Sequence, residues 1–231
     1  MGRIEPLPEG RFSEAAVTVG RAALGSIPVV GPAAAELFGA TVAPVVYRRQ
    51  VEWLNGLADA VNALGNADER WTTETLAASD EFASAVMSAA ESARRTASEE
   101  KHSALRNAVL NSVAPGAPDA HEQMVFLRFV DELTPMHLRL LAYGDNPREW
   151  FRQRGIAEPN FTMGGPSHLL EAGIPEMTGR RDLYDQLVRD LDARGLASVA
   201  LHTTMTADGA WQSWTSAFGK RFLEFISELV L

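Results

Sequence analysis

Hydrophobic side chains recur at helical spacing along most of this 231-residue chain. Within residues 46–64, one face of a helix would carry Val51, Leu54, Leu57 or Ala58, Val61 and Leu64. Pro32 suits a first helical turn, because the N–H that proline lacks is not needed there. The pattern therefore predicts a helix from Pro32 to about Leu64, with a kink or break at Pro44.

A second helical region begins at Thr73 and runs for about forty residues without proline or glycine. Its composition, rich in alanine, glutamate and leucine, has a high helix propensity. The pattern predicts either one long helix or two helices that meet near Ser98. Its first part carries a narrow stripe of mostly small residues, which favours oligomerisation. That stripe consists of Leu76, Phe82 or Ala83, Val86, Ala90 and Ala93.

The clearest interruption of the pattern is PGAPDA, residues 115–120, and we expect a domain boundary there. It divides the chain into an N-terminal helical region, 1–116, and a C-terminal domain, 117–231. Thr134-Pro135 and Asn146-Pro147 each combine a capping side chain with a proline in the first turn, which predicts two helix starts. Further helices are predicted at 121–133, 167–173, 180–195 and 217–231.

The periodicity changes after Gly195, where β-branched and aromatic residues surround Asp208-Gly209. This pattern predicts a β-hairpin with a type I′ turn. The order of three helices and a hairpin over roughly residues 134–231 resembles a winged-helix domain. In that resemblance residues 180–195 form the third helix and residues 200–215 form the wing. The expected fold is mainly α: an N-terminal helical region followed by a winged-helix-like module with a β-hairpin wing.

The formal net charge of the chain is −9, and both halves are acidic. Lys and Arg number 10 against 14 Asp and Glu in residues 1–116, and 11 against 16 in residues 117–231. This charge disfavours binding to nucleic acid and to anionic lipid. The chain has no cysteine, which excludes disulfides and thiolate metal sites and fits a cytoplasmic protein. The N-terminus has no secretory signal pattern.

Two sets of residues in the C-terminal module are candidates for interaction. Arg180, Arg181 and Arg189 lie on the predicted third helix, which reads DNA in a winged helix, but aspartates on the same helix balance their charge. Trp211 and Trp214 flank the predicted turn. On a strand they would face opposite sides, which predicts an exposed tryptophan and a protein partner. The interpretation that we favour is that both cap a small hydrophobic core beneath the wing.

The stretch from Gly25 to Val46 contains a single charged residue, Glu36. Three prolines and many small residues make it a poor transmembrane helix. Two interpretations remain: a core helix, or a segment that is released on activation and perturbs a membrane. The residues at issue are Ile27, Val29, Val30, Leu37, Phe38, Val42, Val45 and Val46.

No pattern in the chain indicates catalysis, a metal or a cofactor. Glu99 and His102 form one Glu-x-x-His step, whereas di-metal helical bundles need two. MGGPSH, residues 163–168, could present backbone N–H groups to an anion, but it lacks the lysine of a phosphate-binding loop. The protein is therefore not expected to be an enzyme.

LTPMHLRLL, residues 133–141, and residues 219–226 are similar to segments of bacterial abortive-infection proteins of the Abi-alpha type. The resemblance implies a role in defence against phage and supplies no catalytic residue. The leading expectation is a non-enzymatic defence or stress protein that acts through a protein partner or as a homo-oligomer, with a membrane step on activation. The alternative is a winged-helix DNA-binding regulator.

Overall fold

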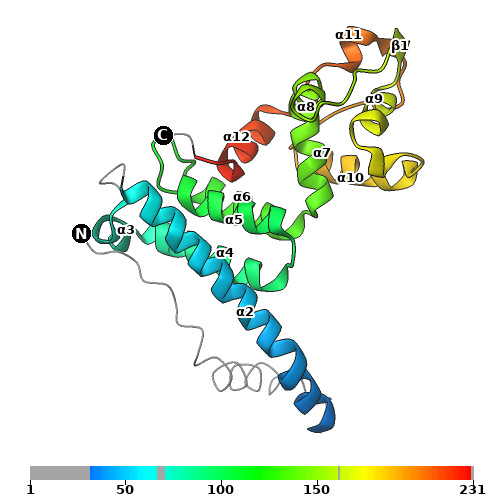
Figure 1. The fold of residues 1–231 in the computed structure, drawn as a ribbon. Coiled ribbons are helices and arrows are strands. Elements are labelled where there is room, and N and C mark those ends of the chain that lie inside the picture. The colour runs from blue at the N-terminus through cyan, green and yellow to red at the C-terminus, as the bar shows by residue number, and fades with distance from the viewer. Residues whose placement is uncertain (1–31, 67–70, 161, 230–231) are drawn as a thin grey trace. The chain divides into compact units, whose positions relative to one another are not determined.

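The computed structural model describes residues 32–66, 71–160 and 162–229, with side chains from Gly39 onward. In this part of the chain the fold is mainly α, with eleven α-helices and one two-stranded sheet. Contacts divide the chain into two compact units, one ending at Asp131 and the other spanning Glu132–Glu228. Figure 1 shows the elements of both.

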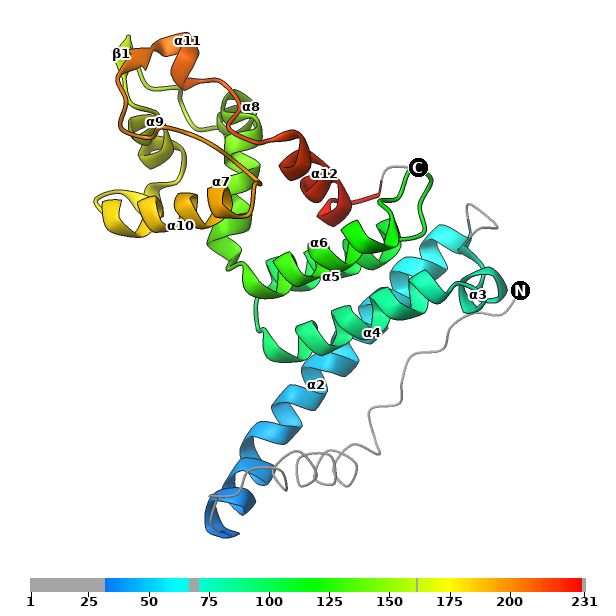
Figure 2. The same ribbon diagram turned by 180° about the vertical axis from the view of Figure 1, so that it is seen from behind.

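The first unit is built from helices that pack side by side. The long α2 lies against both α4 and α5, and α4 also packs against α5 (Figures 1 and 2). The helices of this unit are α2 (Pro32–Gly65), α3 (Thr73–Ala77), α4 (Asp80–Arg95), α5 (Glu99–Asn111) and α6 (Ala120–Glu132). As predicted, one helix begins at Pro32 and ends beside Leu64. It continues through Pro44, which is exposed, so water can satisfy the carbonyl that proline leaves without a donor.

One face of α4, made of alanines, is buried inside the first unit. Ala85, Ala89, Ala90 and Ala93 are at most 8% exposed. Their short side chains let the backbones of neighbouring helices approach closely. Of the predicted stripe, Ala90 and Ala93 lie on this buried face, whereas Ala83 is exposed and Val86 is half-buried. Oligomerisation through the stripe stays a prediction.

Serine caps divide the second helical region. Ser98 caps α5 and accepts a hydrogen bond from the Lys101 N–H at 3.4 Å, so two helices meet there, as one of the alternatives predicts. Ser79 caps α4 in the same way, and this further break separates α3. A serine hydroxyl satisfies an N–H that the start of a helix leaves unpaired.

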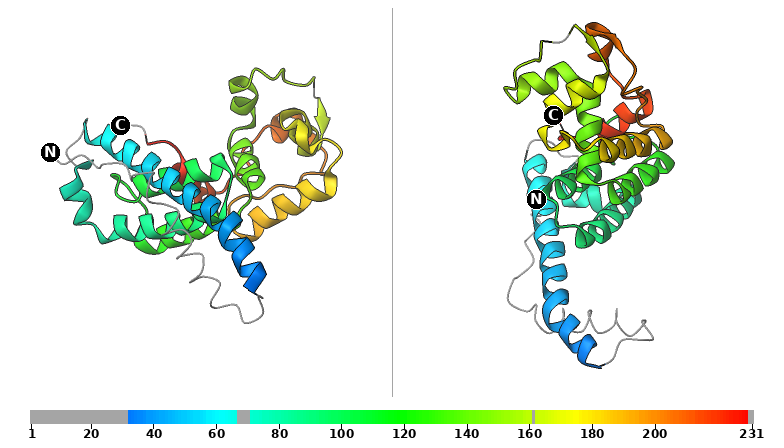
Figure 3. Two further views of the ribbon diagram at one scale, coloured as in Figure 1. Left: turned by 60° about the horizontal axis from the view of Figure 1, so that its bottom comes forward. Right: turned by 90° about the vertical axis from the view of Figure 1, so that its right-hand side faces the viewer.

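In the second unit α7 lies against α8, α10 and α12 (Figure 3). Thr134 and Asn146 cap α7 and α8, which confirms both predicted helix starts. The elements are α7 (Pro135–Asp145), α8 (Pro147–Gln153), β1 (Met163–Gly164), α9 (Pro166–Gly173), the 3-10 helix η3 (Pro175–Met177), α10 (Arg181–Ala193), β2 (Met205–Thr206), α11 (Ala207–Ala210) and α12 (Ala217–Ile226).

The predicted hairpin around Asp208-Gly209 is wrong. Both residues lie in α11, whose N-cap Thr206 accepts a hydrogen bond from the Gly209 N–H at 3.3 Å. The strand before it, β2, pairs antiparallel with β1, with Met163 opposite Thr206. Asp208-Gly209 is a common turn sequence, but here the Thr206 cap starts a helix and β2 pairs with β1, which is distant in the sequence.

The division between the units also differs from the predicted one. PGAPDA forms the connection between α5 and α6, and both helices belong to the first unit. The reason is Asp131 at the end of α6: its carboxylate accepts from Ser92 at 2.5 Å and from Arg95 at 2.8 Å, and its carbonyl accepts from Lys101 at 2.7 Å. These bonds attach α6 to α4 and α5.

Candidate interaction site

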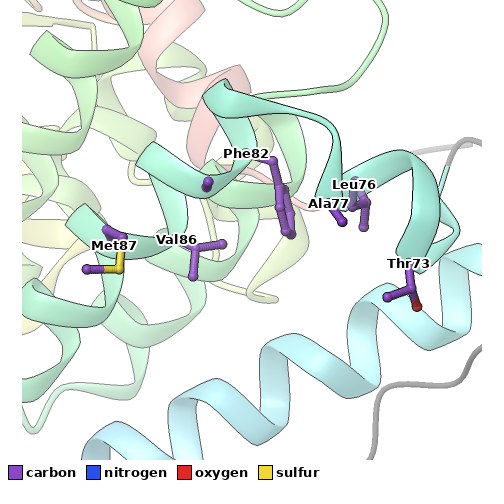
Figure 4. Close-up of a pocket in the computed structure, with 7 residues that line it drawn as sticks. Thr73, Leu76, Ala77, Phe82, Val86 and Met87 are labelled. Atoms are coloured by element: carbon purple, nitrogen blue, oxygen red, sulfur yellow. The ribbon is translucent and has the colours of Figure 1, made fainter.

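An apolar groove lies on the surface of α3 and α4 in the first unit. It runs between Thr73 and Met87 and has a volume of about 350 Å³ (Figure 4). Apart from Thr73, its lining is entirely apolar: Leu76, Ala77, Phe82, Ala83, Val86 and Met87. We call this feature the α3–α4 groove.

Two helix caps create the groove. Thr72 caps α3 by accepting from the Thr75 N–H at 3.3 Å, and Ser79 caps α4 by accepting from the Phe82 N–H at 3.1 Å. The chain therefore turns between Ala77 and Asp80 instead of continuing as one helix. This turn brings the apolar face of the short α3 beside that of α4.

The apolar side chains of the groove are only partly covered. Met87 is 74% exposed, and Phe82 and Val86 are half-buried. Methionine is flexible and polarisable, and it is frequent on surfaces that accept apolar partners of varied shape. An exposed methionine that continues an apolar groove is typical of a protein-binding surface.

The groove has an acidic surround. Between Trp71 and Ala93 the chain has four acidic residues, Glu74, Asp80, Glu81 and Glu91, and no Lys or Arg. Glu91 pairs with Arg94 and Arg95. Among the described residues, Glu74 and Asp80 make no ion pair and are exposed. Glu74 and Asp80 are therefore exposed acidic groups near the α3 end of the groove.

The two tryptophans singled out from the sequence are buried in the second unit. Trp211 is 8% exposed and stacks edge to face with Phe151 at 5.2 Å between ring centroids. Trp214 is 6% exposed and meets Tyr143 in the same way at 5.1 Å. Neither lies on a strand, so the expected alternation of faces does not arise. The structure thus presents no exposed tryptophan at this position, because both indoles pack against aromatic rings of α7 and α8.

The three predicted arginines lie at the exposed surface of α10. Arg180 precedes its first turn, Arg181 pairs with Asp185 at 3.7 Å, and Arg189 donates to Gln186 at 3.0 Å. Asp185 also lies 2.8 Å from His202. The charge of Arg181 is therefore balanced locally, as the composition of the helix indicates.

The apolar stretch is only partly described. Ile27, Val29 and Val30 lie outside the described residues, and Leu37 and Phe38 lie in α2 where side chains are not described. Of the rest, Val42 is 37% exposed and Val45 and Val46 are half-buried. Ala43, between these residues, is 9% exposed, so the described end of the stretch is partly buried. Both interpretations of residues 25–46 stay predictions. Among the described helices, none has the length and apolar composition that crossing a membrane requires.

Two polar segments that the sequence analysis considered make contacts within the fold. His102 lies with Nε2 3.1 Å from the Ala93 carbonyl and Nδ1 3.7 Å from Glu99. Within the described residues, no group of three or more His, Asp or Glu side chains is placed to hold a metal. At MGGPSH the N–H groups of Ser167 and His168 already donate to the carbonyls of Leu201 and Gly165, so they are not available to an anion.

Asp131 titrates abnormally because of the bonds described above. Burial by itself raises its pKa, but hydrogen bonds from Ser92 and Arg95, with the charges of Arg95 and Lys101, outweigh burial and hold the pKa below its usual range. Burial lowers the pKa of Lys101. A carboxyl whose pKa is lower in the folded state stabilises the fold above its unfolded pKa, and this stabilisation is lost as the pH falls through the folded value.

We expect Asp131→Asn to lower the free energy of unfolding by about 1–2 kcal/mol at neutral pH, since the carboxylate is partly exposed. The difference from the unmodified protein should shrink as the pH falls below about 4, where the carboxyl begins to protonate in the unfolded chain. Urea unfolding of both proteins at pH 7 and in acid measures this difference in the free energy of unfolding. A difference that does not change with pH would show that the charge of Asp131 is unimportant.

Sequence reasoning identified part of the groove but not its role. Leu76, Phe82 or Ala83, and Val86 belong to the predicted stripe, whereas Met87 does not. The sequence did contain one sign of the groove: Met87 directly follows Val86, a residue of the face that was expected to be buried. Its exposure depends on which side of α4 meets α2 and α5, and helical spacing alone does not say this.

Comparisons with protein-family models, with curated proteins and with solved structures find no match for this chain.

Proposed function

We propose that this protein is a non-enzymatic binding protein that acts in the bacterial cytoplasm, in defence against phage or in a stress response. Its contact site is the α3–α4 groove. The observation that carries this proposal is an apolar groove open to solvent and continued by Met87, which is 74% exposed. The defence setting is supported by the resemblance of residues 133–141 and 219–226 to abortive-infection proteins. A membrane step of residues 25–46 and self-association stay predictions.

A phage-plating assay in a bacterial host that expresses the protein tests the proposal. We expect Met87→Asp to abolish protection, because a carboxylate in the groove would have to be desolvated when the partner binds. Met124 on α6 is 71% exposed and lies outside the groove, so Met124→Asp is a matched control that should keep full protection. Circular dichroism would check that both variants fold. Full protection by the Met87→Asp variant would reject the groove as the site of action.

A second candidate is a winged-helix DNA-binding regulator. The expected hairpin around Asp208-Gly209 is not found, so the observation that favours this candidate is the exposure of Arg181 and Arg189 on α10 and of Arg180 just before it. This function requires that affinity for random duplex DNA fall steeply between 50 and 200 mM salt, as it does when several phosphates are contacted. It also requires that Arg180→Ala and Arg189→Ala weaken binding. The net charge of −9 leads us to expect no such binding.

A further inference from the structure

We infer that the occupant of the α3–α4 groove is a short amphipathic helix of a partner protein, with lysine or arginine beside its apolar face. This inference rests on the proposed function and names the class of partner. It follows from three properties of the groove: its helical walls, its apolar lining and its acidic surround.

The walls of the groove favour a helix over an extended peptide. Both walls are α-helices, whose backbone hydrogen bonds are made within the helix, so they offer no edge to which a strand could add. Recognition must then come from side chains. A helix presents apolar anchors at positions i, i+3 or i+4, and i+7, which suit a groove that runs between two helical faces. Phe82, Val86 and Met87 would receive these anchors.

The acidic surround selects a cationic helix. Glu74 and Asp80 are exposed. In the sequence Glu74 follows Thr73 of the groove lining, and Asp80 stands two residues before Phe82. Glu81 accepts a hydrogen bond from the neighbouring Ser79 hydroxyl, at 3.2 Å. At the other end, Glu91 is neutralised by Arg94 and Arg95. The exposed acidic side chains that make no ion pair among the described residues therefore lie near α3, and they would orient the partner helix with its cations at that end.

The same charges disfavour a second copy of this chain. A two-fold contact between two grooves would bring the same acidic residues of both copies together, and like charges at an interface oppose association. Outside the groove, the exposed large apolar side chains of the described residues are Val42, Met124 and Met163. They lie on three different elements, α2, α6 and β1, and are widely separated in the sequence.

Fluorescence anisotropy with the full-length protein and three labelled model peptides tests this inference. The first is an amphipathic helix of about 18 residues made of leucine and lysine with anchors at helical spacing. In the second, glutamate replaces every lysine, and the third has the composition of the first in scrambled order. We expect binding of the Leu/Lys helix, at least tenfold weaker binding of the scrambled peptide, and no binding of the Leu/Glu helix.

Substitutions inside and outside the groove test whether the Leu/Lys helix binds there. Met87→Gln with Ala83→Gln changes two exposed groove residues without changing charge, and it should weaken Leu/Lys binding at least tenfold. Met124→Gln should have no effect. Glu74→Gln with Asp80→Asn should weaken binding about fivefold at low salt and less at high salt.

The outcomes separate this inference from the proposed function. If the Leu/Glu helix binds as well as the Leu/Lys helix, the cationic partner is wrong while the groove remains a binding site. If the groove variant binds the Leu/Lys helix as tightly as the unmodified protein, the groove is not where it binds. Val19 lies in the apolar run AAVTV, residues 15–19. If Val19→Asp raised the affinity for the Leu/Lys helix tenfold, these N-terminal residues would compete for the groove, and the inference would be overturned. A dimer that Met87→Gln dissociates would overturn it in favour of a second copy.

Discussion

Gly219→Ala should lower the free energy of unfolding of the second unit by about 3 kcal/mol. Gly219 lies in the first turn of α12, where a Cβ atom would sit 2.0 Å from the Leu196 carbonyl oxygen and 2.8 Å from Thr215 Cγ2. The obstacle is a backbone atom, so no change of rotamer can remove the clash. The same carbonyl accepts the Ser216 N–H at 3.0 Å, and moving α12 away would break this bond.

Helix propensity gives the opposite expectation for this substitution, because alanine is favoured over glycine in a helix by about 1 kcal/mol. Gly39→Ala is therefore an informative control. Gly39 lies inside α2, and a Cβ there meets nothing within 4 Å. We expect the control to be neutral or slightly stabilising. Thermal unfolding by circular dichroism measures both variants. If Gly219→Ala were stabilising as well, the close approach of α12 to Leu196 would be wrong.

Trp53→Ala should destabilise the first unit by about 3–5 kcal/mol. Trp53 is 1% exposed, and its indole N–H donates to the His102 carbonyl of α5 at 3.0 Å. His102 in turn contacts the Ala93 carbonyl of α4 through Nε2. The variant would leave a cavity where three helices are linked and would remove the donor of a buried carbonyl. Since domains of this size have a total stability of about 5–15 kcal/mol, the loss is severe.

Trp53→Phe separates packing from the hydrogen bond. It keeps most of the buried ring and loses the N–H donor, so we expect a smaller loss of about 1–3 kcal/mol. Urea unfolding of the two variants and the unmodified protein gives the comparison. Equal losses for alanine and phenylalanine would mean that the hydrogen bond, and not the packing, is the main contribution of Trp53.

Helix starts were predictable because their determinants are adjacent in the sequence. Thr134-Pro135, Asn146-Pro147 and Ser98 each place a capping oxygen next to the N–H groups that it satisfies. Such short-range interactions do not depend on the rest of the fold.

The incorrect predictions involve partners that are distant in sequence. Asp208-Gly209 has the residues of a tight turn, but the preceding strand pairs with Met163-Gly164 and the chain enters α11. Contacts place the division between the two units after Asp131, although PGAPDA is a stronger local interruption of the sequence than the end of α6. The contacts that attach α6 to the first unit join Asp131 to residues 30 to 39 positions earlier.

From its amino acids alone, this protein could be assigned a helical fold, the starts of most of its helices and an acidic character, because these depend on neighbouring residues and on composition. The groove, the burial of Trp211 and Trp214, and the burial of the alanine face of α4 could be decided only by tertiary structure. Helical spacing shows that Val86 and Met87 lie on adjacent faces of α4. Which of these faces water reaches depends on where α2, α3 and α5 pack, and that depends on contacts between residues far apart in the chain.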